Sequence, residues 1–215
     1  MAPRTLVLGI GNVLWADEGF GVRCVERLAE LWSFGPEVSL LDGGTQGLYL
    51  LHHVQDAEAL IVFDAVDYGL APGTLKVVEG DEVPAFMGAK KMSLHQTGFQ
   101  EVLAAAQLTG RYPGTVVLIG CQPEELEDYG GGLRAPVAAQ IPAALDVALT
   151  RLRALGHAPR AEATTEEARA DALAAPALRM DAYEGGRPSA EAACRIGDER
   201  FLPSQAPHPA LKATA

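Results

Sequence analysis

Short, continuous apolar runs alternate along the chain with longer stretches in which apolar residues recur every three or four positions. Runs without polar alternation are typical of strands buried on both faces of a parallel sheet, whereas the spaced pattern predicts amphipathic helices. The predicted strands are Thr5 to Ile10, Val38 to Leu41, Ala59 to Phe63, Thr74 to Val78 and Thr115 to Ile119. Their alternation with helices predicts an α/β fold: a mostly parallel five-stranded twisted sheet with helices on both faces, a three-layer sandwich.

Local signals mark the ends of the predicted helices. Asp17 has the position of a helix cap at the start of the first helix, and Gly35-Pro36 ends that helix. Ser93-Leu94-His95-Gln96 has the S-x-x-Q form of a capping box, which would open a helix. Ala135 to Leu155 reads as one long amphipathic helix, with Gly156 as its C-terminal cap.

The composition changes after residue 157. The segment 158–215 is rich in Ala, Glu, Arg and Pro and poor in large apolar residues, so we expect a poorly ordered C-terminal tail, with at most a loose helix over Ala161 to Ala175. Residues 1–157 are expected to form the α/β domain, and they carry every candidate functional residue.

Charge and cysteine content exclude several classes of protein. The formal net charge is −11 and the isoelectric point is near 4.9, which disfavours binding to nucleic acid or to anionic membranes. No apolar run is long enough to span a bilayer. The three cysteines are odd in number and include no C-x-x-C pair, which argues against disulfides and structural zinc and indicates a reducing cytoplasm.

Polar side chains collect where the predicted strands end, and ligand sites in open α/β sheets lie at that edge. Glu18 follows the first strand, Asp42 the second and Asp64 the third, while His95 lies in the first turn of the helix opened by the capping box. Two carboxylates and an imidazole, namely Glu18, Asp64 and His95, could bind a divalent transition metal with coordination positions left open. A helix N-terminus disfavours imidazolium, so we expect His95 to stay neutral and able to bind a metal.

Each of these side chains also has a purely structural interpretation. Asp17 and Glu18 could cap and stabilise the start of a helix. Asp64 could bond to a loop at the end of its strand, and His95 could be an exposed residue of a first turn. The spacing of the three metal-ligand candidates fits no short motif, so the residues alone leave both interpretations open.

Two other classes of site are less well supported. The glycines of Gly9-Ile10-Gly11-Asn12 suggest a dinucleotide-binding turn, but the fingerprint fails at its third glycine, where Leu14 stands. No serine lies in a G-x-S-x-G elbow, and no cysteine has a local protease signature, so serine and cysteine peptidase mechanisms are unsupported.

Taken together, six blocks resemble the nickel–iron hydrogenase maturation endopeptidases, and the tail 158–215 resembles the longer members of that family, which are attached to uptake hydrogenases. The order and spacing of the blocks agree with that family over roughly residues 4–155. The blocks are Leu6–Asn12 (LVLGIGN), Asp17–Arg23 (DEGFGVR), Leu41–Thr45 (LDGGT), Asp64–Asp67 (DAVD), Ala71–Thr74 (APGT) and Ser93–Gln96 (SLHQ).

The resemblance implies an endopeptidase that removes the C-terminal extension of a nickel-loaded hydrogenase large-subunit precursor, after a basic or histidine residue. It also implies that Glu18, Asp64 and His95 bind the metal. The family is grouped with aspartic endopeptidases, but Asp42-Gly43-Gly44 is not their D-T/S-G motif. Catalysis would fall to Asp64, Glu18 and Asp42, with Asp67 a further carboxylate at the same rim and the general base left open.

We therefore expect nickel to arrive with the precursor as the recognition element, and the enzyme to be a cytoplasmic monomer that pairs with its substrate transiently. The metal, or a carboxylate beside it, would activate water for peptide hydrolysis. Two rival functions remain: a nickel-dependent assembly chaperone that does not cleave, and a Rossmann-type nucleotide-binding enzyme. A cleavage assay separates the first rival, and titration with NAD and ATP separates the second.

Overall fold

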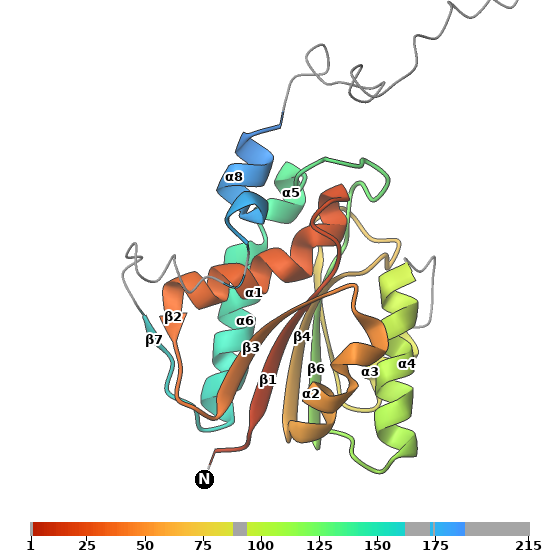
Figure 1. Ribbon diagram of the computed structural model, residues 1–215, viewed down its shortest axis with the longest axis vertical. Helices are drawn as coiled ribbons and strands as arrows, with labels where there is room; N and C mark the ends of the chain where they lie inside the picture. Colours follow the sequence, from red (N-terminus) through yellow and green to blue (C-terminus); the bar gives the residue numbers. More distant parts are fainter. Residues whose placement is uncertain (1, 88–93, 162–172, 174, 188–215) are drawn as a thin grey trace, which may run out of the picture.

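A five-stranded sheet forms the centre of the computed structural model, which describes residues 2–87, 94–161, 173 and 175–187 (Figure 1). For residues 85–87 and 94–97 only the backbone is described. The strand order is β3-β1-β4-β6-β5, in which β5 is antiparallel to β6 and every other pair is parallel. The strands are β1 (Thr5–Ile10), β3 (Val38–Gly44), β4 (Ala59–Ala65), β5 (Leu75–Glu79) and β6 (Thr115–Cys121).

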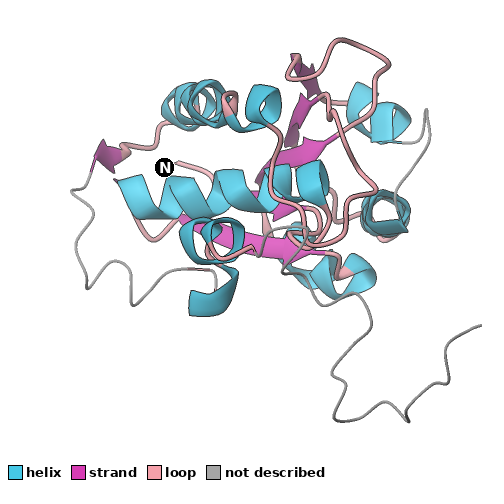
Figure 2. Ribbon diagram, turned by 90° about the horizontal axis from the view of Figure 1, so that it is seen from above, coloured by secondary structure: helices cyan, strands magenta, loops and turns pink. Residues whose placement is uncertain are grey.

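Helices cover both faces of this sheet, as Figure 2 shows from above. One face packs against α1 (Phe20–Leu31) and α6 (Ile141–Ala154). The other packs against α2 (Leu51–Asp56), α3 (Glu82–Met87) and α4 (Leu94–Leu108). β4 is buried along its whole length because it has a parallel neighbour on each side and a hydrophobic core on each face. The predicted α/β sandwich with a mostly parallel sheet is confirmed.

Two glycines let α1 lie unusually close to the sheet. A Cβ atom on Gly21 would lie 2.2 Å from the carbonyl oxygens of both Ile10 and Phe63, and one on Gly9 would lie 2.4 Å from the carbonyl oxygen of Gly21. Since no other residue fits such a crossing, these positions require glycine. The contact fixes the start of α1 over the carboxyl ends of β1 and β4.

The single helix expected over 135–155 is wrong, because the chain forms α5 (Ala135–Ala138) and then α6. Pro142 explains the break: proline has no N–H to bond the carbonyl of Ala138, so it starts a new helix instead of continuing the old one. The predicted end is confirmed. Gly156 has a φ of 91° and donates to Arg153, while the His157 N–H donates to Leu152, as in a Schellman motif.

Several short elements have no counterpart in the sequence pattern. β2 (Trp32–Ser33) pairs antiparallel with β7 (Arg160–Ala161). The others are the 3-10 helices η1 (Ala16–Gly19) and η3 (Pro176–Leu178), and the helices α3 and α8 (Met180–Gly185). A further 3-10 helix, η2 (Gly47–Leu50), leads directly into α2.

Parts of the segment 158–215 lie against the α/β domain. Leu173 and Met180 pack against the hydrophobic core that α1 and α6 form with the sheet, and β7 pairs with β2. The loose helix expected over 161–175 falls almost wholly outside the described residues. A domain boundary after residue 157 stays a prediction. Among the described helices, none combines the length and the apolar character needed to cross a membrane.

Candidate functional site

Three of the predicted site residues lie at one end of the sheet, where the parallel strands β1, β3 and β4 finish (Figure 1). Asp42 is the fifth of the seven residues of β3, and Asp64 is the penultimate residue of β4. Glu18 is in η1, which follows β1 and contacts β4. The sheet topology therefore gathers these carboxylates at the edge where ligands bind in open α/β folds.

The glycine crossing brings Glu18 and Asp64 towards each other. Gly21 packs on the carbonyl of Phe63, the residue before Asp64, and Glu18 lies one turn before Gly21. The backbone of Glu18 is also fixed, because the Asn12 N–H donates to its carbonyl at 3.1 Å. Gly11 allows this contact: its φ is 140°, and a Cβ there would lie 1.8 Å from the Glu18 carbonyl oxygen. The Glu18 side chain is half-buried at the rim.

Asp64 is fully buried, and Tyr68 is close enough for the Asp64 carboxylate to act on its hydroxyl group. Tyr68 lies over Gly120, the register partner of Asp64, where a Cβ would come within 2.1 Å of its hydroxyl oxygen. Burial raises the pKa of Tyr68 well above its usual value, and the neighbouring Asp64 carboxylate raises it further. Tyr68 is therefore a protonated hydroxyl close to the Asp64 charge. The sequence interpretation missed it, although it follows the DAVD block directly.

Asp42 is held in place by a local hydrogen bond near the end of β3. The Gly44 N–H donates to Asp42 Oδ1 at 2.9 Å, and Gly44 adopts a φ of 46° that favours glycine. The Gly11 N–H in turn donates to the Gly44 carbonyl at 3.1 Å, which joins the loops after β1 and β3. Burial raises the pKa of Asp42, against the lowering effects of the Gly44 N–H and the Arg23 charge. Its carboxylate is therefore a stronger base than an exposed aspartate.

His95 is the second residue of α4, which places it in a first turn as predicted. A Cβ on Gly98, one turn later, would lie 3.3 Å from Gly47 Cα, so the start of α4 packs on η2, just after β3. The side chain of His95 and all of Ser93 lie outside the described residues. Among the described side chains, which do not include that of His95, no three His, Cys, Asp or Glu residues cluster so that they could hold a metal.

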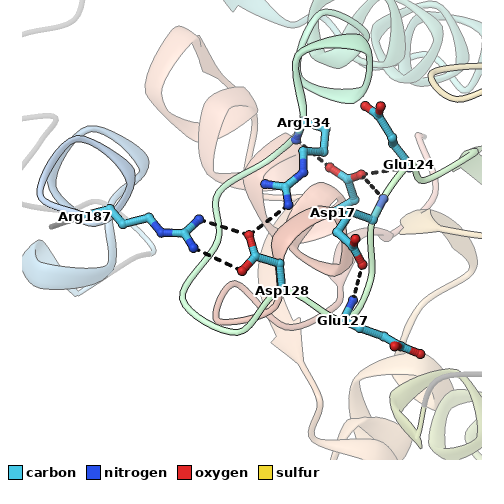
Figure 3. A network of polar contacts seen from close by, with 7 residues as sticks. Asp17, Glu124, Glu127, Asp128, Arg134 and Arg187 are labelled. Atoms are coloured by element: carbon cyan, nitrogen blue, oxygen red, sulfur yellow. Dashed lines mark hydrogen bonds and ion pairs between the residues drawn. The ribbon is translucent and has the colours of Figure 1, made fainter. Parts of the chain in front are cut away.

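The expectation that Asp17 caps a helix is wrong. Asp17 is completely buried and accepts backbone N–H groups from Glu124 at 2.8 Å, Glu125 at 2.9 Å and Arg134 at 2.7 Å (Figure 3). The first helical turn is the separate η1, and α1 starts at Phe20; the Phe20 N–H donates to the Asp17 carbonyl, but the Asp17 side chain caps neither helix. Asp17 instead ties the connection between β6 and α5 to the segment that carries Glu18.

Asp67, a further carboxylate at the rim, has a structural partner. Its Oδ1 accepts the Gly69 N–H at 2.9 Å and the Gln122 side-chain amide at 3.0 Å. Gln122 Oε1 also accepts the Tyr68 N–H at 2.7 Å. Gln122, which the sequence did not single out, thus holds the loop after β4 against the end of β6.

The two described cysteines are not nucleophiles. Cys24 and Cys121 are fully buried on the same face of the sheet. Burial raises the pKa of the Cys121 thiol to about 12, with a smaller contribution from the Asp17 charge, and burial also raises the pKa of Cys24. Since the thiolate is the reactive form, both side chains are inert at neutral pH.

Comparison with known proteins gives a consistent result. A family model of hydrogenase maturation proteases matches residues 22–151. The hydrogenase expression/formation protein HoxM of Cupriavidus necator is 62% identical over 198 residues, covering 92% of this chain and 98% of that protein. HupD of Rhodobacter capsulatus is 64% identical over 203 residues, covering 94% and 95%.

The solved structure of the hydrogenase maturating endopeptidase HybD from Escherichia coli has a TM-score of 0.70 and 41% identity. The structural match covers 74% of this chain and 98% of the HybD chain. The match to HoxM spans 198 of the 215 residues, so it extends at least to residue 198 even if it starts at residue 1. It therefore includes η3 and α8, and HoxM shares this C-terminal part of the chain. The family model, in contrast, ends before it.

Proposed function

The chain belongs to the hydrogenase maturation protease family, and from that premise we propose that it removes the C-terminal extension of a nickel-loaded nickel–iron hydrogenase large-subunit precursor. Similarity to an endopeptidase of known structure, over 98% of that structure, favours cleavage over a chaperone without activity. The wholly buried Asp17 and the missing third glycine leave little support for a nucleotide site.

Nickel enters this proposal as part of the substrate, recognised by Glu18, Asp64 and His95. The observation that carries it is the Gly21 crossing, which fixes the segment of Glu18 against the end of the strand that bears Asp64. The first turn of α4, with His95, begins at the same edge of the sheet. A carboxylate–imidazole set completes the coordination of a metal that the precursor already holds in part, and so places the scissile bond.

The proposed chemistry is hydrolysis by a carboxylate-activated water, which would make the enzyme an aspartic-type endopeptidase. Asp64 or Asp42 accepts a proton from water while the oxygen adds to the scissile carbonyl carbon, and that proton passes to the amine as the C–N bond breaks. The raised pKa of Asp42 suits it to this role. The substrate metal supplies polarisation of the carbonyl.

Incubation of the purified protein with nickel-loaded and nickel-free precursor, followed by intact-mass measurement, tests the function. We expect loss of a C-terminal peptide from the loaded form only. Asp64→Asn should lower the rate at least about 100-fold, whereas Asp146→Asn, an exposed aspartate on α6, should leave it unchanged. Cleavage of both precursor forms would remove the metal from the proposal, and no cleavage of loaded precursor would contradict the enzyme.

We also propose that the enzyme acts as a monomer in the cytoplasm. The buried, protonated Cys24 and Cys121 are compatible with a reducing compartment. Light scattering after size-exclusion chromatography should give the 22.6 kDa mass of one chain, and a mass twice as large would contradict the proposal.

A further inference from the structure

The connection between β6 and α5, residues 122–134, is an irregular segment that lies against η1. On its inner side it is held by the Asp17 carboxylate, which accepts three of its backbone N–H groups. The contact is reciprocal, since the Asp17 N–H donates to Glu125 and the Ala16 N–H donates to Gly131, each at 3.1 Å. The position of this connection and the position of the adjoining Glu18 are therefore linked.

The outer side of the same connection is held by the C-terminal segment (Figure 3). Both terminal nitrogens of Arg187 bind Asp128, at 3.0 and 3.1 Å, and Arg134 binds the same carboxylate at 2.8 Å. The Leu133 N–H bonds to the Glu184 carboxylate. Glu184 lies so close to Gly132 that a Cβ there would be 2.5 Å from its Oε2 atom. These contacts close over the connection opposite Asp17.

A buried arginine anchors the C-terminal segment to the domain. Arg23 of α1 is 2% exposed, and its Nη1 donates to the Leu178 carbonyl at 2.6 Å and to Glu26 at 2.9 Å. Its Nε lies 3.6 Å from Glu184. A buried, charge-assisted contact of this kind fixes η3 and α8 relative to α1 far better than an exposed ion pair would.

We propose that Arg187 and Asp128 are positioning residues for the reaction, because they clamp the 122–134 connection onto Asp17 and so hold Glu18 in place. This inference rests on the proposed function, since it assigns the clamp to the same site. Arg187 lies beyond residue 151, where the family model ends, and within the part of the chain that matches HoxM, whereas Asp128 lies inside the region that the family model covers. Arg187 is thus an addition to the family core that contacts the 122–134 connection from the C-terminal side.

Charge reversal at Arg187 tests the clamp. Arg187→Glu should speed hydrogen exchange at the amides of Glu124, Glu125 and Arg134 by about tenfold, since it repels Asp128. It should lower kcat for precursor cleavage by roughly 10-fold, as loss of an outer support typically does, with KM little changed. Arg187→Lys should restore most of kcat because it keeps the charge. The matched control is Arg160→Glu, an exposed position on β7.

The two readouts separate failure of the clamp from failure of the proposed function. Unchanged exchange at the three amides in Arg187→Glu would overturn the clamp even if the enzyme cleaves. Faster exchange with unaltered kcat would overturn the positioning role. If the wild-type chain does not cleave loaded precursor, the proposed function fails and the positioning role fails with it, while the exchange data still report whether the clamp exists.

Discussion

Asp17 joins segments more than a hundred positions apart in the sequence, since its partners are Glu124, Glu125 and Arg134. Asp17→Ala would leave three partly buried N–H groups without their acceptor, so we expect the free energy of unfolding to fall by about 3 kcal/mol. Urea denaturation measures the change. Asp146→Ala, at an exposed site on α6, should alter the free energy of unfolding by less than about 0.5 kcal/mol. A similar small change for Asp17→Ala would contradict the structural role.

Because the Cys121 thiol is buried, we expect the protein to lose stability in alkali. This thiol ionises near pH 9 in the unfolded chain but near 12 in the folded protein, because burial disfavours the thiolate. Stability from this group is therefore fully present below about pH 9 and is lost as the pH rises towards about 12. Unfolding measured across this range should show a smaller decline for Cys121→Ala than for the wild type. Equal declines in both proteins would refute this account of the thiol.

Single residues are where the sequence is least informative. Asp17 and Glu18 are adjacent acids, and both suit the start of a helix, so no local pattern separates a buried tether from a rim carboxylate. Tyr68 and Gln122 were missed for the same reason: their roles come from contacts with Gly120 and Asp67 that only the folded chain creates. Asp42 and Asp64 could be predicted, because each directly follows a continuous apolar run that predicts a strand.

At the scale of elements, the approach of α1 to the sheet depends on Gly21. Gly21→Ala places a methyl group against two backbone carbonyls, so α1 must shift, and we expect a destabilisation of roughly 3 kcal/mol by overpacking. Because the shift moves Glu18, precursor cleavage should also fall. Thermal unfolding and the cleavage assay measure the two effects. Gly35→Ala is the control, since a Cβ there meets nothing within 4 Å; equal behaviour of the two variants would argue against the crossing.

Element type could be read from the sequence better than element ends or directions. The continuous apolar runs predicted all five strands of the main sheet, but the long helix over 135–155 is split at Pro142. The antiparallel direction of β5 follows from the connection 66–74, which is too short for the crossover that a parallel strand needs. Pairs as short as β2 and β7 carry no periodic signal, so they could not be predicted.

For the molecule as a whole, the sheet should open last at its centre. β4 is bonded to β1 and β6 and buried on both faces, whereas β5 is an edge strand that is only partly buried. Native-state hydrogen exchange should therefore show amides of β4 exchanging only on global unfolding, and amides of β5 exchanging by smaller openings. Equal protection of the two strands would contradict this order.

The location of the site also belongs to this scale. The rule that ligands bind beyond the carboxyl ends of strands correctly selected the edge that holds Asp42, Asp64 and the segment of Glu18. The packing of η3 and α8 on that edge was not foreseen, since their composition resembles a solvated tail. Arg23 and Asp128, which anchor them, are charged residues with no apolar periodicity to reveal a contact.

β1 leads upward from the N-terminus, which lies at the end of the sheet away from the carboxylate rim (Figure 1). Ala2 is beside Gly156, at the far end of α6. An affinity tag or a covalent linker attached at the N-terminus would hold the enzyme to a bead with the carboxylates of the candidate site facing outward. A column built in this way would present every molecule in the same orientation to a passing precursor.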